Sequence, residues 1–187
     1  MAYQQMVHPQ GEQATALAAA ALGAGLVLST QASTLLEDVA HTVLSEPDRG
    51  PLWFQLYLLP DRGFMRALVQ RAEAAGFEAL VLTVDAPVQG ARDRERRAGF
   101  RRPADITAVN LAGRVAPAPL ALQPGQSKLF DDLMTHAPTW DDIAWLRSIT
   151  RLPVLLKGVV HPDDARQALG CGAAGLIVSN HGGRTLD

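Results

Sequence analysis

The chain has 187 residues and a formal net charge of -2, and 48% of its residues are hydrophobic while 19% are charged. This is the balance of a globular protein with a sizeable core, and it provides no electrostatic footprint for binding nucleic acid. The single cysteine, Cys171, excludes an intrachain disulfide and favours a reducing compartment, so we expect a cytoplasmic protein.

The amino-terminal part predicts a helix, a strand and a second helix. Residues 10–23 are rich in alanine and end on glycine, which is typical of a helix, and the apolar run 26–29 follows as a short strand. Thr34 and Glu37 have the spacing of a capping box, which predicts a second helix reaching to about residue 41. Glycines interrupt the longest uncharged stretch, so we do not expect it to span a membrane.

Two further strands enclose the next predicted helix. The apolar runs 53–59 and 79–84 are the strands, and Asp61 is placed to cap a helix that ends at Gly76. Residues 86–138 then interrupt the alternation with many prolines and glycines and an arginine-rich run. We predict a long loop there, of a length that usually indicates a functional lid or a disordered segment.

The alternation resumes after this loop. Thr139 and Asp142 bracket the start of an amphipathic helix, and the apolar run 153–159 is the next strand. Pro162 suits the first position of a further helix, and residues 173–179 form the last predicted strand.

Apolar strands between amphipathic helices indicate an α/β fold with a parallel sheet, either doubly wound or a (β/α)8 barrel. Polar residues lie at the carboxyl end of each strand, namely Ser29, Gln55, Tyr57, Thr83, Asp85, Lys157, Ser179, Asn180 and His181. Ligand groups from several strands favour the barrel, because a doubly wound sheet concentrates them near one switch point. A barrel needs about 250 residues and eight strands, so we predict that residues 1–187 form one incomplete barrel domain.

Several motifs in this order resemble those of the FMN-dependent α-hydroxy acid oxidases and dehydrogenases. They are WFQLYLLPDR (53–62), LTVDAP (82–87) with a following GAR (90–92), LPVLLKGV (152–159) and SNHGGRTLD (179–187). The resemblance implies a partial TIM barrel in which strands two to six are present and the first and the last two strands are missing. It also implies FMN across the carboxyl-terminal mouth and residues 86–138 as an active-site loop.

By the same resemblance, His181 is the general base, and Asp85 orients it and stabilises its protonated form. Tyr57 contacts the substrate, and the guanidinium groups of Arg92 and Arg184 bind the substrate carboxylate.

The resemblance also assigns residues to FMN. The Lys157 ammonium lies at the pyrimidine edge of the flavin, and Ser29, Gln55 and Thr83 hydrogen-bond the polar edge of the ring. Ala2 contributes a backbone contact beneath it. Gln31 is expected in the specificity pocket, and Gln31 and Thr185 depart from residues common in the family. We expect no metal site, because the histidines lack ligand spacing.

The implied reaction is oxidation of an (S)-2-hydroxy acid to a 2-oxo acid, with either hydride transfer to flavin or a carbanion route. O₂, a quinone or a cytochrome would reoxidise the flavin, and the full-length parent is expected to be a homotetramer. Two alternatives stay open: another FMN-binding barrel, such as a flavin-dependent isomerase or an inosinate-type dehydrogenase, and an inactive fragment of a hydroxy acid oxidase.

Overall fold

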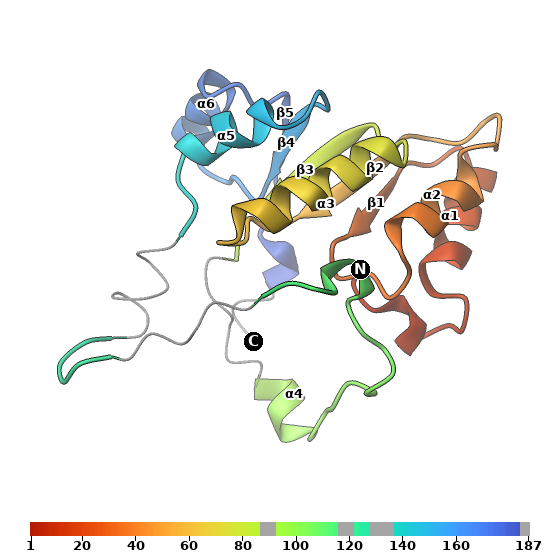
Figure 1. The fold of residues 1–187 in the computed structure, drawn as a ribbon, viewed down its shortest axis with the longest axis horizontal. Coiled ribbons are helices and arrows are strands. Elements are labelled where there is room, and N and C mark those ends of the chain that lie inside the picture. Colours follow the sequence, from red (N-terminus) through yellow and green to blue (C-terminus); the bar gives the residue numbers. More distant parts are fainter. Residues whose placement is uncertain (87–92, 116–121, 128–136, 184–187) are drawn as a thin grey trace.

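One parallel sheet forms the centre of the protein (Figure 1). The computed structural model describes residues 1–86, 93–115, 122–127 and 137–183. The strands pair in chain order and are β1 (Leu26–Ser29), β2 (Leu52–Leu56), β3 (Ala79–Thr83), β4 (Val154–Lys157) and β5 (Gly175–Ile177). The predicted parallel α/β fold is confirmed, although β2 ends before Tyr57 and β5 is shorter than expected.

Helices alternate with the strands as expected. They are α1 (Gly11–Ala21), α2 (Leu36–Val43), α3 (Arg62–Ala74), α4 (Asp93–Arg97), α5 (Asp141–Ser148) and α6 (Pro162–Gly170). The predicted cap of α3 is confirmed, because an Asp61 carboxylate oxygen accepts a hydrogen bond from Phe64 N at 2.9 Å. Pro162 begins α6 as predicted.

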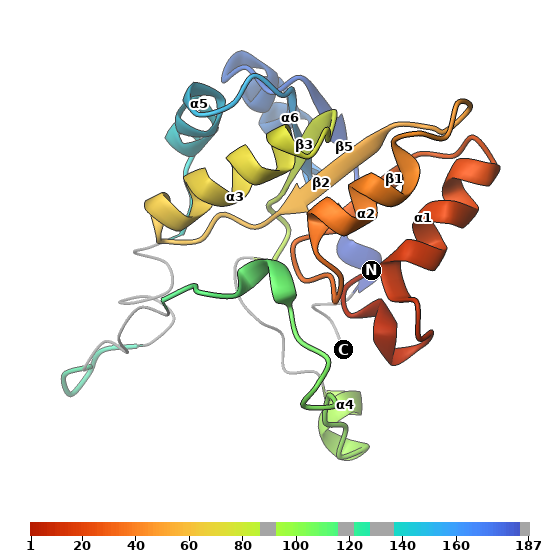
Figure 2. The same cartoon turned by 45° about the vertical axis from the view of Figure 1, so that its right-hand side comes forward.

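The two faces of the sheet differ in burial. Leu28, Phe54 and Leu156 lie on the face that packs into the main core with the helices, and each is at most 1% exposed. On the other face, Trp53 and Leu155 are only half-buried. Successive side chains alternate between the faces of a strand, so helices cover one face while the second face is more open. Figure 2 shows these helices and the sheet from a second angle.

The capping box predicted at Thr34 and Glu37 is wrong. Helix α2 begins at Leu36, and no local side chain caps it. Thr34 Oγ1 instead donates to Glu12 at 2.9 Å, while Glu37 pairs with Arg71 at 2.7 Å. The spacing was right, but both side chains have tertiary partners that compete with the local cap.

The segment predicted as a loop, residues 86–138, contains some regular structure in its described parts. These parts hold the short helix α4 and the 3-10 turn η2 (Val109–Leu111). Asn110 in η2 is fully buried; its Oδ1 accepts from Leu36 N at 2.9 Å and its Nδ2 donates to the Thr34 carbonyl at 3.0 Å. Asn110 therefore supplies the cap of α2 from far along the chain and fixes part of the segment to the body of the protein.

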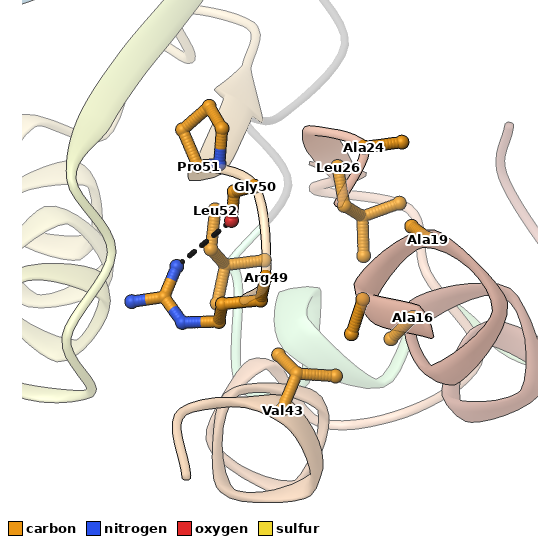
Figure 3. A pocket seen from close by; sticks show the side chains of 10 residues that line it. Ala16, Ala19, Ala24, Leu26, Val43, Arg49, Gly50, Pro51 and Leu52 are labelled. Atoms are coloured by element: carbon orange, nitrogen blue, oxygen red, sulfur yellow. Dashed lines mark hydrogen bonds between the residues drawn. The ribbon is translucent and has the colours of Figure 1, made fainter. Parts of the chain in front are cut away.

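The amino-terminal end of the sheet is closely packed. A small pocket there is lined by alanines of α1, by Val43 and by the start of β2, with the Arg49 guanidinium bonded to the Gly50 carbonyl at 3.0 Å (Figure 3). Its cavity volume is about 10 Å³, which leaves room for no more than one water molecule. The residues around this pocket therefore pack closely against one another. No helix of the described residues is long and apolar enough to cross a membrane.

Candidate active site

The more open face of the sheet is apolar along most of its length and carries polar side chains at the carboxyl ends of its strands. Ser29 pairs in register with Gln55, and Thr83 pairs with Lys157. Ser29 Oγ donates to Gln55 Oε1 at 3.3 Å, and Gln55 Nε2 donates to Thr83 Oγ1 at 3.0 Å. The parallel register therefore places hydroxyl, amide and ammonium groups from four strands along one edge of the sheet.

Asp85 joins two further polar residues at this edge. It lies two residues after β3, and its side chain is only 6% exposed. One carboxylate oxygen, Oδ2, lies 2.9 Å from Lys157 Nζ, and the other, Oδ1, lies 2.6 Å from His181 Nδ1. One carboxylate thus binds the ammonium at the end of β4 and an imidazole that follows β5.

These contacts set the protonation state of Asp85. Burial alone would raise the pKa of this carboxyl, but hydrogen bonds from His181 and Lys157, together with the Lys157 charge, lower the pKa below its ordinary value. Asp85 is therefore ionised at neutral pH, and an ionised carboxylate only accepts hydrogen bonds. His181 Nδ1 must then be the donor, so in the neutral imidazole the lone pair lies on Nε2.

The backbone around His181 is unusual and turns the imidazole towards Asp85. His181 opens the 3-10 turn η4 (His181–Gly183) and has a φ of 58°, a left-handed conformation that few residues other than glycine adopt. Its backbone N–H donates to Ser179 Oγ at 3.0 Å, which closes the turn after β5. Gly182 follows with a φ of 64°, so the glycine after His181 serves the backbone of this turn.

The amino-terminal segment lies against the loop that follows β1. Tyr3 N donates to the Gln31 carbonyl at 3.1 Å, so Ala2 is held beside this loop. The Arg102 guanidinium lies 4.7 Å from the centroid of the Tyr3 ring, a cation–π contact between the long segment and the amino terminus.

The structure thus brings together the residues predicted at the strand ends. Asp85, His181 and Lys157 are in direct contact, and Ser29, Gln55 and Thr83 form one hydrogen-bonded row. Tyr57 follows β2 directly and is half-buried. Arg92, Arg184 and Thr185 lie outside the described residues.

Sequence reasoning missed two residues at this end of the protein. Asn110 stands in a segment without periodicity, so no sequence signal indicated that it is buried. Gly158 follows Lys157 with a φ of 110° and lies against Asp85. A glycine directly after an apolar strand indicates a close approach of the backbone to another group, but the sequence does not reveal that this group is Asp85.

The row of side chains suits the polar edge of a flavin. That edge presents both carbonyl oxygens and an N–H group, and Gln55, Ser29 and Thr83 offer donors as well as acceptors. Lys157 adds a positive charge with 24% of its side chain exposed at the same edge. Within the described part of the chain, no three metal-ligating side chains gather at one point.

Comparisons with known proteins agree with this fit. The family model described as FMN-dependent dehydrogenase matches residues 1–187. An L-lactate oxidase of Alicycliphilus denitrificans is 53% identical over the whole chain, which covers 50% of that oxidase, and a glycolate oxidase of Spinacia oleracea is 44% identical, with 49% of it covered.

A solved structure shows the same likeness in three dimensions. A mandelate oxidase crystallised with 3,3-difluoro-2-hydroxy-3-phenylpropionic acid superposes with a TM-score of 0.79 at 42% identity, and the match covers 100% of this chain and 48% of that one. The neighbours are TIM-barrel FMN oxidases, so the predicted barrel class is confirmed, and the chain spans about half the length of the relatives it matches. The chain belongs to the FMN-dependent dehydrogenase family.

Proposed function

We propose that this chain provides the proton-accepting half of an FMN-dependent oxidase that converts an (S)-2-hydroxy acid into a 2-oxo acid. The observation that supports this proposal most is the contact of Asp85 with both His181 and Lys157 at the carboxyl end of the sheet. The relatives are named as lactate, glycolate and mandelate oxidases, which supports a 2-hydroxy acid as the substrate class.

In this mechanism His181 Nε2 accepts a proton from the substrate. The proton comes from the hydroxyl group in a hydride route and from Cα in a carbanion route, and the same nitrogen serves both. The ionised Asp85 holds the Nδ1–H tautomer and stabilises the imidazolium that forms. When bound, FMN supplies the acceptor for the two electrons that leave the substrate.

The other residues predicted near the carboxyl ends of the strands have proposed roles in binding FMN or the substrate. Ser29, Gln55 and Thr83 would hold the polar edge of FMN, with Ala2 in backbone contact, and Lys157 would place positive charge at the pyrimidine edge. For the substrate we propose Tyr57, Arg92 and Arg184, the two arginines as partners of its carboxylate.

The wider proposals concern the electron acceptor and the assembly. The oxidase names of the relatives favour O₂ over a quinone or a cytochrome. A homotetramer of the full-length protein, and residues 86–138 as a loop over the active site, also stay proposals. Because the chain spans about half the length of its relatives, an inactive fragment is the second candidate.

Replacing His181 tests the proposed reaction. In the full-length protein that contains this sequence, His181→Gln removes the proton acceptor and leaves the groups assigned to FMN. We expect the variant to keep its flavin absorbance but to lose anaerobic flavin reduction by lactate, glycolate or mandelate by about 10²- to 10⁴-fold.

His41→Gln, an exposed histidine in the last turn of α2, is the matched control and should reduce flavin at the normal rate. Unchanged flavin reduction in His181→Gln would contradict the proposal. A 187-residue chain that purifies without flavin, while the full-length protein holds flavin, would favour the second candidate.

A further inference from the structure

We propose that Gly158 is a positioning residue, whose missing side chain leaves the space in which the Asp85 carboxylate lies between Lys157 and His181. The contacts in the structure support the claim that Gly158 leaves space for the Asp85 carboxylate. The effect of Gly158 on flavin reduction rests on the proposed function, since Asp85 would act through His181.

The available space at Gly158 is the first observation. A Cβ atom placed on Gly158 would lie 2.4 Å from Asp85 Cβ and 2.8 Å from both Asp85 Cγ and Oδ2. Carbon atoms without a covalent bond normally approach to about 3.5–4.0 Å, so these contacts are severe overlaps. Oδ2 is also the atom that accepts from Lys157, so a methyl group here would push on the ion pair itself.

Neither backbone can withdraw freely from this contact. Gly158 N donates to the Ile177 carbonyl at 3.0 Å, and Val84 N donates to the Lys157 carbonyl at 2.9 Å. These bonds extend the ladders between β3, β4 and β5, so a movement of Gly158 away from Asp85 breaks sheet hydrogen bonds. Rotation of the Asp85 side chain relieves the contacts of Cγ and Oδ2 but not that of Cβ, so the backbone of Asp85, two residues after β3, must shift as well. Both movements displace the carboxylate from His181.

The positive φ of Gly158 is a second reason for a glycine here, and a control variant separates it from the overlap with Asp85. Gly113 also has a positive φ, 80°, but no heavy atom lies within 4 Å of a Cβ placed there. Gly113→Ala therefore isolates the cost of a left-handed alanine. Gly158→Ala adds the overlap with Asp85 to a backbone cost of the same kind.

The experiment compares these two alanine variants in the full-length protein with its flavin. The readouts are the NMR resonance of the His181 Nδ1 proton, identified by its absence in His181→Gln, and the rate of flavin reduction by substrate. For Gly158→Ala we expect this resonance to shift upfield or vanish and the reduction rate to fall about 100-fold with little change in KM, because the base is displaced. Gly113→Ala should leave both readouts unchanged.

A double variant covers the case in which Gly158→Ala does not fold. Asp85→Gly removes all three overlapping atoms, so Gly158→Ala should lower the denaturation midpoint less in the Asp85→Gly protein than in the wild type. A Gly158→Ala protein that folds with the wild-type resonance overturns the inference. So does an Asp85→Gly protein that folds but tolerates Gly158→Ala no better than the wild type does.

The proposed function can fail separately. If His181→Gln still reduces flavin normally, the proposed function is wrong. The Nδ1 proton resonance and the denaturation midpoints would still test the positioning role of Gly158.

Discussion

Asp85 illustrates how one buried carboxylate can position two other side chains. Its carboxylate is 6% exposed and serves two donors, His181 and Lys157, so each donor restricts the position of the other. Removing a charge from water costs free energy, but here the hydrogen bonds from His181 and Lys157 and the Lys157 charge outweigh that cost and lower the pKa of Asp85. The arrangement therefore fixes the imidazole and also favours the folded state at neutral pH.

The lowered pKa of Asp85 predicts a pH dependence of folding stability. Because the folded chain holds this proton less tightly than the unfolded chain, Asp85 adds stability above the ordinary carboxyl pKa of about 4. The contribution is lost as the pH falls through the lowered pKa of the folded state. Asp85→Asn should therefore reduce the free energy of unfolding by about 1–3 kcal/mol at pH 7, and this difference should shrink in acid.

Urea unfolding of the wild type and of Asp85→Asn between neutral and acid pH measures this difference. Other carboxyl groups, such as those of Glu12 and Glu37, also have a lowered pKa, so only the difference between the two proteins reports on Asp85. Asp38→Asn on the exposed side of α2 controls for the change in net charge. A wild-type-to-variant difference that stays constant with pH would refute the assignment.

At this scale the sequence predicted the residue types but not their contacts. Asp85 and His181 stand 96 positions apart, and only the resemblance to a known family placed them together. The contact of Lys157 with Asp85 was not expected, because the lysine was assigned to the flavin. Neither spacing nor hydrophobic pattern contains such information; it depends on the register of β3, β4 and β5.

Among the elements, the buried carboxylate of Glu12 joins the amino terminus to the loop after β1. Glu12 is fully buried, and its oxygens accept from Gln4 N at 3.0 Å, from Ser33 N at 2.9 Å and from Thr34 Oγ1 at 2.9 Å. Burial raises the pKa of this carboxyl, but the hydrogen bonds outweigh it and lower the pKa overall. The charge is thus satisfied by hydrogen bonds from several segments.

Asn110 extends this network to the long segment after β3, and its replacement is predicted to have two separable effects. Asn110→Ala removes the cap on Leu36 N and the bond to the Thr34 carbonyl, so it should destabilise the protein by about 1–2 kcal/mol. It should also increase proteolysis within residues 93–115, because this anchor to the body is lost. Urea unfolding and limited proteolysis measure the two effects.

Asn110→Asp is the matched variant, since it keeps an oxygen for Leu36 N but cannot donate to Thr34. It should retain most of the cap and lose mainly the second bond. If Asn110→Ala changed neither the free energy of unfolding nor the rate of proteolysis, the hydrogen bonds of Asn110 would not stabilise the protein.

Sequence patterns succeeded at this scale where contacts are local. The cap of α3 by Asp61 and the start of α6 at Pro162 involve neighbouring residues, and both were predicted correctly. The cap of α2 involves Asn110, 74 positions from Leu36, and the local pattern at Thr34 pointed to the wrong partner. Local propensity is overridden wherever a buried tertiary partner offers a better hydrogen bond.

For the molecule as a whole, the unequal faces of the sheet matter most. Helices bury one face fully, whereas on the other Val27 is 38% exposed and Trp53 is half-buried. In the described residues β1 and β5 are also the edge strands of the sheet. Unpaired edges beside a partly apolar face promote association between chains.

The last prediction concerns the 187-residue chain produced by itself. We expect it to bind a hydrophobic dye and to elute above the size of a 20.0 kDa monomer, because the open sheet face contacts a second copy. Val27→Glu on this face should reduce both effects, whereas Leu22→Glu, an equally apolar residue that is 82% exposed beyond the end of α1, should not. Equal effects of the two substitutions, or a dye-free monomer, would show that the open face does not drive association. Since the relatives are about twice as long, their remaining half is the part we expect to cover this face, and adding it to the chain should abolish dye binding.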